Sequence, residues 1–231
     1  MNQFRWSVDP FRIAASTGGV ALMLTLLISW QGTPIGGDLR IIREVQQADP
    51  LRGNEGWVNT LGTFRMQLFI VLAAVTAATF GPLLRLPCEA AVDRTRAIWV
   101  LVTAIGFRFL AFPLKEATQA ERPLSNLGVH VSRGFHGYGF PSGHVYSDVL
   151  IFGALALVAP ALFGRAVGSA IRVVCVAIIL MAGPARMVVG AHWPSDVAGG
   201  YLWGISALCL CVAIGSRLAH SKATSRMAPA R

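Results

Sequence analysis

The stretch Arg-Met-Val-Val-Gly-Ala-His-Trp-Pro-Ser-Asp, residues 186–196, lies between two long apolar runs and carries a cation, an imidazole and a carboxylate in that order. Pro194 suits the first position of a following helix, because its missing N–H would have no partner there. Asp196 then falls in the first turn, where the positive end of the helix dipole stabilises a carboxylate. His192 lies four residues earlier, within reach of that carboxylate, which would hold one ring nitrogen and leave the other free to attack or to take a proton. By itself the stretch is equally typical of a capped helix start with an interfacial histidine and tryptophan.

The apolar runs on either side belong to a series of six segments, each long enough to cross a bilayer, which takes about 17–25 residues. The six segments are 11–30, 66–84, 97–114, 145–163, 173–189 and 197–214. The first has a basic flank but no small-residue cleavage site after it, so it is expected to be a retained span. The alternating pattern of a membrane barrel does not occur. The sequence therefore predicts an all-α, polytopic membrane bundle of six transmembrane helices.

The composition also favours a membrane protein. Of the 231 residues, 54% are hydrophobic and 13% are charged, whereas soluble domains carry about 25% charged residues. The formal net charge is +9, but the basic residues are scattered among apolar runs, so membrane lipids rather than nucleic acid are the expected partners. The cysteines have no zinc-type spacing with a histidine, and we expect packing roles and no disulfide. They are Cys88, Cys175, Cys209 and Cys211.

The basic residues predict the orientation of the spans, since Lys and Arg gather in cytoplasmic loops. If the N-terminus is cytoplasmic, the larger set faces inward: Arg5, Arg12, Arg85, Arg94, Arg96, Arg165, Arg172, Arg217, Lys222, Arg226 and Arg231. The smaller, outward set is Arg40, Arg43, Arg52, Arg65 and Arg133, with Lys115, Arg122 and Arg186. Both termini are therefore expected in the cytoplasm. The chain is expected to be one domain, 1–231, in the plasma (bacterial inner) membrane.

Residues 31–60 form the first predicted outer loop. Within it, Asp38 would cap a short amphipathic helix lying in the membrane interface, with Trp57 as an anchor. The apolar face of that helix would consist of Leu39, Ile42 and Val45. A solvated loop fits this composition nearly as well.

The remaining connections are expected to be short and cytoplasmic. Residues 85–96 and 164–172 are the predicted inner loops, and the basic tail, 216–231, is expected to fray from residue 217. Gly200 and Gly204 in the last span have a spacing that suits close helix packing.

Polar residues gather in the second predicted outer loop, 115–144. It begins Lys-Glu-Ala-Thr-Gln-Ala-Glu-Arg-Pro (115–123) and ends Gly-Phe-Pro-Ser-Gly-His (139–144). Lys115 and Arg122 would share a face if the preceding helix continued. Gly143 opens the fourth span, where backbone N–H groups have no helical partners and can bind an anion that no side chain obstructs. Taken alone, each motif fits a capped helix start or snorkelling cations somewhat better than a site.

Together, in this order and on one side of the membrane, the three motifs resemble those of the type 2 phosphatidic acid phosphatase (PAP2) superfamily. The pattern of that family is Lys-x6-Arg-Pro, then Pro-Ser-Gly-His, then Ser-Arg-x5-His-x3-Asp, and here it falls at 115–123, 141–144 and 185–196. The six-span layout extends the likeness over most of the chain. One position departs from the pattern, since Ala185 replaces the usual serine. This removes a possible hydroxyl contact to phosphate but no nucleophile, acid or cation.

The resemblance implies a role for each motif residue. His192 resembles the nucleophile that takes the phosphoryl group, Asp196 orients it, and His144 is similar to the general acid that protonates the leaving oxygen and later activates water. The implied phosphate ligands are Lys115, Arg122, Ser142, Gly143 and Arg186. Three cations facing a phosphoryl group can take the place of Mg²⁺, and the outer loops contain no acidic cluster for a metal. Neither a metal nor another cofactor is therefore expected.

The implied activity is hydrolysis of a lipid phosphate at the periplasmic or outer face of the membrane. Substrates that the resemblance allows are undecaprenyl pyrophosphate, phosphatidylglycerophosphate, phosphatidic acid and lipid A phosphates. A lipid phosphotransferase would use the same residues. A non-catalytic lipid-phosphate binding or transport protein is the other alternative, although such a protein needs no nucleophile. The oligomeric state is not indicated.

Three further polar residues lie outside the motifs. Arg108 lies inside the third span, where a charge normally pairs or faces a cavity. Its expected partner is Asp148, one turn into the fourth span, or else it extends the site toward a second phosphate. His130 and His136 are expected to be solvated rather than catalytic.

Overall fold

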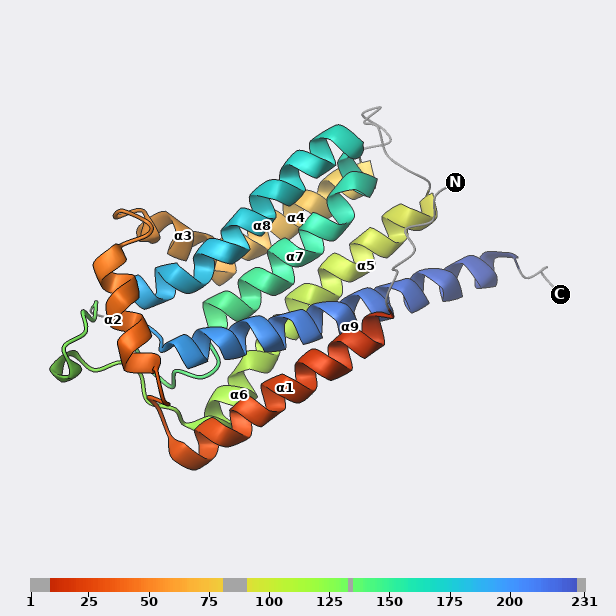
Figure 1. Ribbon diagram of the computed structural model, residues 1–231. Helices are drawn as coiled ribbons and strands as arrows, with labels where there is room; N and C mark the ends of the chain where they lie inside the picture. The colour runs from red at the N-terminus through yellow and green to blue at the C-terminus, as the bar shows by residue number, and fades with distance from the viewer. Residues whose placement is uncertain (1–8, 81–90, 133–134, 228–231) are drawn as a thin grey trace.

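The computed structural model describes residues 9–80, 91–132 and 135–227, without the side chains of 91–93, 216 and 218–227. The predictions for Arg5, Arg85, Cys88, Arg133 and Arg231 fall outside these residues. Within the described ranges the regular structure is entirely helical (Figure 1). The helices are α1 (Pro10–Gln31), α2 (Asp38–Ala48), α3 (Glu55–Leu61), α4 (Phe64–Phe80), α5 (Ala91–Phe107), η1 (Arg108–Leu110), α6 (Ala111–Thr118), η2 (Ser125–Leu127), α7 (Gly143–Phe163), α8 (Arg165–Val188) and α9 (Pro194–Met227).

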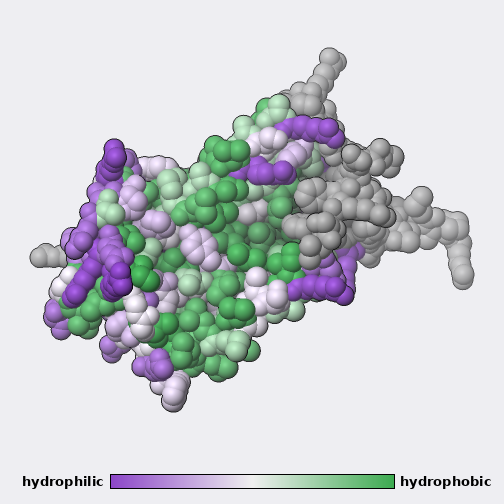
Figure 2. All heavy atoms as spheres, in the orientation of Figure 1, coloured by the Kyte–Doolittle hydropathy of each residue, from purple (hydrophilic) through white to green (hydrophobic). Residues whose placement is uncertain are grey.

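Five helices of the described chain are long and apolar enough to cross a membrane. These are α1, α7, α8, the Pro194–Gly215 part of α9, and the stretch Arg94–Thr118 that α5, η1 and α6 form together. Helices α3 and α4 are bent by 58° at the short break between them, and a sixth span results if the pair is counted as one. Figure 2 shows hydrophobic residues in a band across the helices and hydrophilic residues at its two ends. The predicted all-α, multi-pass membrane bundle is confirmed.

Two helix starts follow directly from local sequence. Asp9 caps α1 by accepting a hydrogen bond from the Phe11 N–H at 2.9 Å, and Pro10 occupies the first helical position. In α9, Pro194 is again the first residue and Asp196 lies in the first turn. The predicted start of the last span is confirmed.

Helix α7 lies at the centre of the bundle and is buried along most of its length. The small residues of α9 allow the two helices to pack closely. A Cβ on Gly200 would lie 2.9 Å from the Ser142 carbonyl oxygen, and one on Gly204 would lie 2.8 Å from Cβ of Val149. The packing role predicted for these two glycines is confirmed.

Three predicted loops are shorter than expected, because the helices continue through them. Helix α8 begins at Arg165, so the predicted inner loop 164–172 contracts to Gly164, whose φ of 77° suits glycine. Helix α5 begins at Ala91, inside the predicted loop 85–96, and α9 continues to Met227 instead of fraying from residue 217. Helix α6 ends at Thr118, so the second outer loop begins after that residue.

The predicted amphipathic helix in the first outer loop is present as α2, but its apolar face contacts protein. Ile42 is fully buried in a cluster with Met187 and Trp193, with Leu39 and Val45 packed beside it. The apolar face of the helix therefore packs on the bundle, and its position at the membrane interface stays a prediction. Gly37, not Asp38, is its N-cap, and Trp57 is half-exposed on α3.

The predicted motifs meet at one end of the bundle, which we call the site end. It contains α2, α3, the loop after α6 and the first turns of α7 and α9 (Figure 1). The start of α1 and the end of α9 lie at the opposite end. Which side of the membrane each end faces stays a prediction.

Candidate active site

His192 is held in one tautomer by its two neighbours. Its Nδ1 lies 3.2 Å from Oδ2 of Asp196, and its Nε2 lies 3.2 Å from Nη1 of Arg122. A carboxylate accepts hydrogen bonds and a guanidinium only donates them. We therefore assign the proton to Nδ1, which donates to Asp196, and a lone pair to Nε2, which accepts from Arg122. Asp196 Oδ2 also accepts from the Trp193 N–H at 3.0 Å. The predicted reach between His192 and Asp196 is confirmed.

The imidazole of His192 is neutral in this environment. It is buried, and burial disfavours the charged ring. After burial, the positive charges of Arg122, Lys115 and Arg186 also lower the pKa of His192, followed by His144, and the pKa lies well below its ordinary value. The contact between the ring and its carboxylate is therefore a hydrogen bond of a neutral imidazole, not an ion pair.

A backbone hydrogen bond joins the start of α7 to the start of α9. The Ser142 N–H donates to the Asp196 carbonyl at 2.9 Å. Gly139 allows this approach, because a Cβ there would lie 2.7 Å from Oδ2 of Asp196. The second and third sequence motifs are thus held in contact through main chain.

Ser142 has a hydroxyl that is not used for capping. An N-cap serine ordinarily accepts a hydrogen bond from its own helix. Ser142 is the fully buried N-cap of α7, yet its Oγ makes no such bond and has no partner among the described residues. Gly143 follows as the first residue of α7, where an N–H precedes the first intrahelical bond. Both groups suit an anionic ligand.

Lys115 and Arg122 both bind the backbone of loop residues 137–139. Lys115 Nζ donates to the carbonyls of Tyr138 and Gly139 at 2.8 and 3.0 Å. Arg122 Nε donates to the Gly137 carbonyl at 2.9 Å, and Arg122 Nη2 donates to the Tyr138 carbonyl at 3.2 Å. Arg122 Nη1 also donates to the Ala191 carbonyl at 2.6 Å. Since α6 ends at Thr118, this shared loop brings the two cations together, and the predicted common helix face was wrong.

Arg186 approaches the same region from the last turn of α8. It is 6% exposed, and its Nη1 donates to Oδ1 of Asn59 at 2.9 Å. Its Nε is buried and has no partner in the described ranges. The Phe135 ring lies 5.2 Å from the Arg186 guanidinium and 6.0 Å from that of Arg122. Two guanidiniums thus share one aromatic side chain, and Arg186 keeps a donor available for an anion.

His144, the second residue of α7, faces the turn between α3 and α4. A Cβ on Gly62 in that turn would lie 2.6 Å from Cδ2 of His144 and 3.2 Å from Oδ2 of Asp148. A glycine therefore allows the turn to pack directly against the second histidine. No sequence motif indicated this contact.

A buried polar network lies one turn deeper than His144 and corrects the predicted direct pairing of Arg108 with Asp148. Gln67, which is fully buried, stands between them. Arg108 Nε donates to Gln67 Oε1 at 2.9 Å, and Gln67 Nε2 donates to Asp148 Oδ1 at 2.7 Å and to Ser147 Oγ at 3.1 Å. The amide satisfies both charged groups because it can donate and accept at once. A second phosphate near Arg108 stays a prediction.

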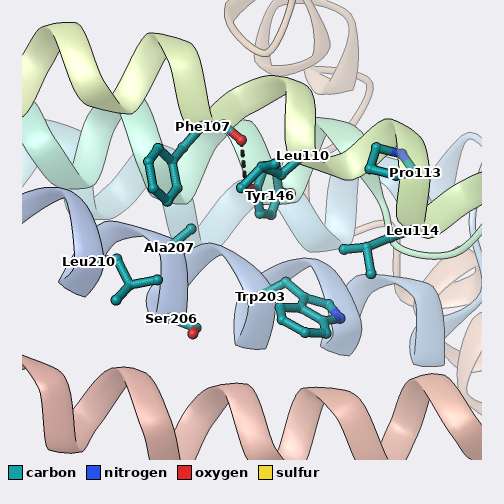
Figure 3. Close-up of a pocket in the computed structure, with 9 residues that line it drawn as sticks. All are labelled: Phe107, Leu110, Pro113, Leu114, Tyr146, Trp203, Ser206, Ala207 and Leu210. Carbon is teal, nitrogen blue, oxygen red and sulfur yellow. Dashed lines mark hydrogen bonds between the residues drawn. The ribbon is translucent and has the colours of Figure 1, made fainter.

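An apolar cavity of about 260 Å³ lies on the other side of α7 (Figure 3). Leu114, Tyr146 and Trp203 contribute to its lining, and the Tyr146 hydroxyl donates to the Phe107 carbonyl at 2.7 Å. Residues two apart on a helix lie about 200° apart around its axis. Tyr146 and His144 therefore point to opposite faces of α7, and the cavity is separate from the histidines.

Sequence reasoning missed the residues that support the motif side chains. Asn59, Gly62 and Phe135 lie outside any motif, and only Gln67 carried a signal, as a polar residue within a span. His130 and His136 are exposed. In the described part of the chain, three or more His, Cys, Asp or Glu side chains are nowhere grouped so as to hold a metal ion.

Comparisons with known proteins relate this chain to one family. A family model described as the PAP2 superfamily matches residues 96–219. Lipid A 1-phosphatases from Rhizobium etli and Rhizobium johnstonii are each 32% identical to this chain over 112 residues, which is 46% of this chain and 44% and 42% of theirs. The match thus spans less than half the length of these relatives.

A solved structure extends the likeness in fold. The crystal structure of the first transmembrane PAP2 type phosphatidylglycerolphosphate phosphatase from Bacillus subtilis superposes with a TM-score of 0.68 at 17% identity, covering 89% of this chain and 96% of that one. The family model covers more than half of the chain, including all three motifs. This protein therefore belongs to the PAP2 superfamily.

Proposed function

We propose that this protein hydrolyses the phosphate of a membrane lipid phosphate through a phosphohistidine at His192. One observation carries the proposal. The lone pair of Nε2 on a buried, neutral His192 accepts from Arg122 at 3.2 Å, in a region where Lys115 and Arg186 also lower the pKa of that ring. A protein that only bound a lipid phosphate would need the cations but not an oriented nucleophile.

In the first step, Nε2 of His192 attacks phosphorus and the bond from phosphorus to the lipid oxygen breaks. His144 gives its proton to that oxygen, so the lipid leaves as an alcohol, or as a monophosphate if the substrate is a diphosphate. In the second step, His144 takes a proton from water, the resulting hydroxide attacks phosphorus, and the P–N bond breaks. Inorganic phosphate leaves and His192 is neutral again. The two histidines thus work in opposite protonation states.

The phosphate ligands we propose are the three cations Lys115, Arg122 and Arg186, with the Ser142 hydroxyl and the Gly143 N–H. Support comes from the buried Oγ of Ser142 and Nε of Arg186, which lack partners among the described residues. A phosphoryl group would supply acceptors for both donors. Fixed donors aimed at the transferred group stabilise the charge that spreads over its oxygens. We expect the reaction to need no metal ion.

For the substrate, the curated relatives favour a lipid A phosphate, because those proteins are named lipid A 1-phosphatases. Phosphatidylglycerophosphate, phosphatidic acid and undecaprenyl pyrophosphate are the other candidates. We place the site end at the periplasmic face of the inner membrane, which the distribution of Arg supports.

The decisive experiment follows the phosphoryl group. Purified protein in detergent and EDTA should release phosphate from at least one of these four lipids. With a labelled aryl phosphate, whose leaving group needs little protonation, and quenching that avoids acid, His144→Ala should accumulate labelled protein. The first step is then partly independent of His144, while the residue that activates water for the second step is missing. His192→Ala should be inactive and unlabelled. Label on His192→Ala, with none on the wild type or His144→Ala, would show that His192 is not the nucleophile.

A further inference from the structure

Helix α2 lies across the site end, beside the end of α8 and the start of α9 (Figure 1). Its fully buried Ile42 packs with Met187 and Trp193, which lie in the segment from Arg186 to Asp196. Beyond this apolar contact, each end of α2 makes polar contacts with one end of that segment.

The first contact is made by Asp38, which is 3% exposed. Its Oδ1 accepts from the Ser195 N–H at 2.9 Å, and its Oδ2 accepts from the Ser195 hydroxyl at 2.7 Å and from the Ile35 N–H at 3.0 Å. Ser195 lies in the first turn of α9, immediately before Asp196. Asp38 therefore satisfies a free N–H at the start of α9 from a different helix.

The second contact is made by Gln46, in the last turn of α2. Its Nε2 donates to the Met187 carbonyl at 3.0 Å and to the His130 carbonyl at 2.8 Å, and its Oε1 accepts from the His130 N–H at 2.9 Å. Met187 directly follows Arg186 in the last turn of α8, and its carbonyl also accepts from the Gly190 N–H at 2.9 Å. One amide thus ties the end of α8 to the loop after α6.

The chain between these two anchors is short and tightly packed. It turns at Gly190, with a φ of 68°, where a Cβ would collide with the His130 carbonyl. The Ser132 N–H donates to the Val189 carbonyl at 2.9 Å. The relative position of Arg186 and His192 therefore depends on the two ends of α2 and on the loop that Gln46 holds.

We infer that α2 is a positioning element for the reaction, with Asp38 and Gln46 as its positioning residues. Asp38 acts through Ser195 on the turn that carries Asp196 and His192. Gln46 acts through Met187 on Arg186. The hydrogen bonds of these two side chains go to other residues than the proposed phosphate ligands. This inference rests on the proposed phosphatase activity and explains why a segment far from the motifs is built into the site.

The two anchors predict different kinetic effects. Asp38→Asn leaves an amide N–H facing the Ile35 N–H, and Ser195→Ala removes the hydroxyl donor. Both disturb the nucleophile, so kcat should fall by about tenfold or more while KM and the inhibition constant of inorganic phosphate stay near wild type. Gln46→Met keeps the length of the side chain but loses its four hydrogen bonds. Gln46→Met should displace Arg186, which is one of the proposed phosphate ligands. Inorganic phosphate should therefore also inhibit this variant less strongly.

The assay uses full-length protein in detergent with dioctanoyl phosphatidic acid, or whichever of the four lipids the wild type hydrolyses. Gln47→Ala is the matched control, since Gln47 is the exposed neighbour of Gln46 on the same helix and should keep wild-type kinetics. The double variant Asp38→Asn/Ser195→Ala should lose no more than the worse single variant, because both act through one contact. Thermal unfolding tests whether each variant is folded. If Asp38→Asn is not folded, Ser195→Ala and Gln46→Met decide whether α2 positions the site.

Wild-type kcat in the folded Asp38 and Ser195 variants would overturn the positioning role, as would an equal loss in Gln47→Ala. Those results leave the proposed function standing. A wild type that releases phosphate from none of the four lipids would instead overturn the proposed function, and the positioning role with it.

Discussion

His192 lies between a group that can only accept a hydrogen bond and a group that can only donate one. Asp196 holds Nδ1 and Arg122 faces Nε2, each at 3.2 Å. The same cation that approaches the nucleophile also disfavours a second proton on the ring. At the scale of single residues, one guanidinium thus contributes both to phosphate binding and to keeping the nucleophile neutral.

This double role predicts a pH effect. A lowered pKa means that the ring loses its proton at a lower pH, so His192 stays neutral as the pH falls through the ordinary value of about 6.5. Arg122→Gln removes the largest charge contribution, so the pKa of His192 should rise toward that value. The acid limb of kcat/KM should therefore move to higher pH in this variant, in addition to an overall loss of activity.

The measurement is kcat/KM between pH 5 and 9 for both proteins on one substrate, so that ionisation of the phosphate, with a pKa of about 6, is common to both. Arg40→Gln removes an exposed arginine on α2 and should leave the profile in place. Superimposable acid limbs for the wild type and Arg122→Gln would show that Arg122 does not control the charge of the nucleophile.

At the scale of elements, the turn between α3 and α4 packs against the start of α7. Gly62 ends α3 with helical backbone angles, φ −75° and ψ −3°. The position therefore needs a glycine for lack of space rather than for backbone freedom. The neighbouring atoms are Cδ2 of His144 and Oδ2 of Asp148.

Gly62→Ala should displace the ring of His144, since the new Cβ would lie 2.6 Å from Cδ2. We expect kcat to fall by about tenfold on lipid substrates. An aryl phosphate, whose leaving group needs little protonation, should be affected less in the first step. Gly56→Ala is the matched control, because a Cβ at this position in α3 meets no atom within 4 Å. An unchanged kcat in Gly62→Ala would mean that the position of His144 does not depend on this turn.

At the scale of the whole molecule, all the motif residues lie at one end of the bundle, and the start of α1 and the end of α9 lie at the other (Figure 1). Figure 2 shows the apolar band between these ends. In the proposed reaction, the substrate phosphate would therefore lie near one membrane surface while its hydrocarbon part stays in the bilayer. The excess of Arg at the opposite end predicts that the site end faces outward.

Cysteine labelling in intact cells tests this orientation. In a background without the native cysteines, Asn126→Cys in the loop after α6 should react with an impermeant thiol reagent, and Ala166→Cys at the start of α8 should react only after the cells are opened. Both positions are exposed and lie at opposite ends of the bundle. Labelling of Ala166→Cys alone in intact cells would place the site end in the cytoplasm.

The sequence by itself determined the class of protein and the motif residues. Apolar segments of membrane-crossing length predict helices because a bilayer leaves no other partner for backbone groups. The start of α9 followed from local chemistry, since Pro194 and Asp196 act on their own helix. Four residues along one short turn also suffice to bring His192 to Asp196.

Only the tertiary structure decided how the motifs meet and what supports them. Lys115 and Arg122 converge on loop carbonyls rather than on one helix face, and Gln67 replaces a direct ion pair between Arg108 and Asp148. Asp38 and Gln46 contact residues more than a hundred positions away. Such contacts leave no periodic signal in the sequence, because they depend on how whole helices pack. Burial then sets the charge state of His192, and burial is a property of the packed bundle rather than of the motif.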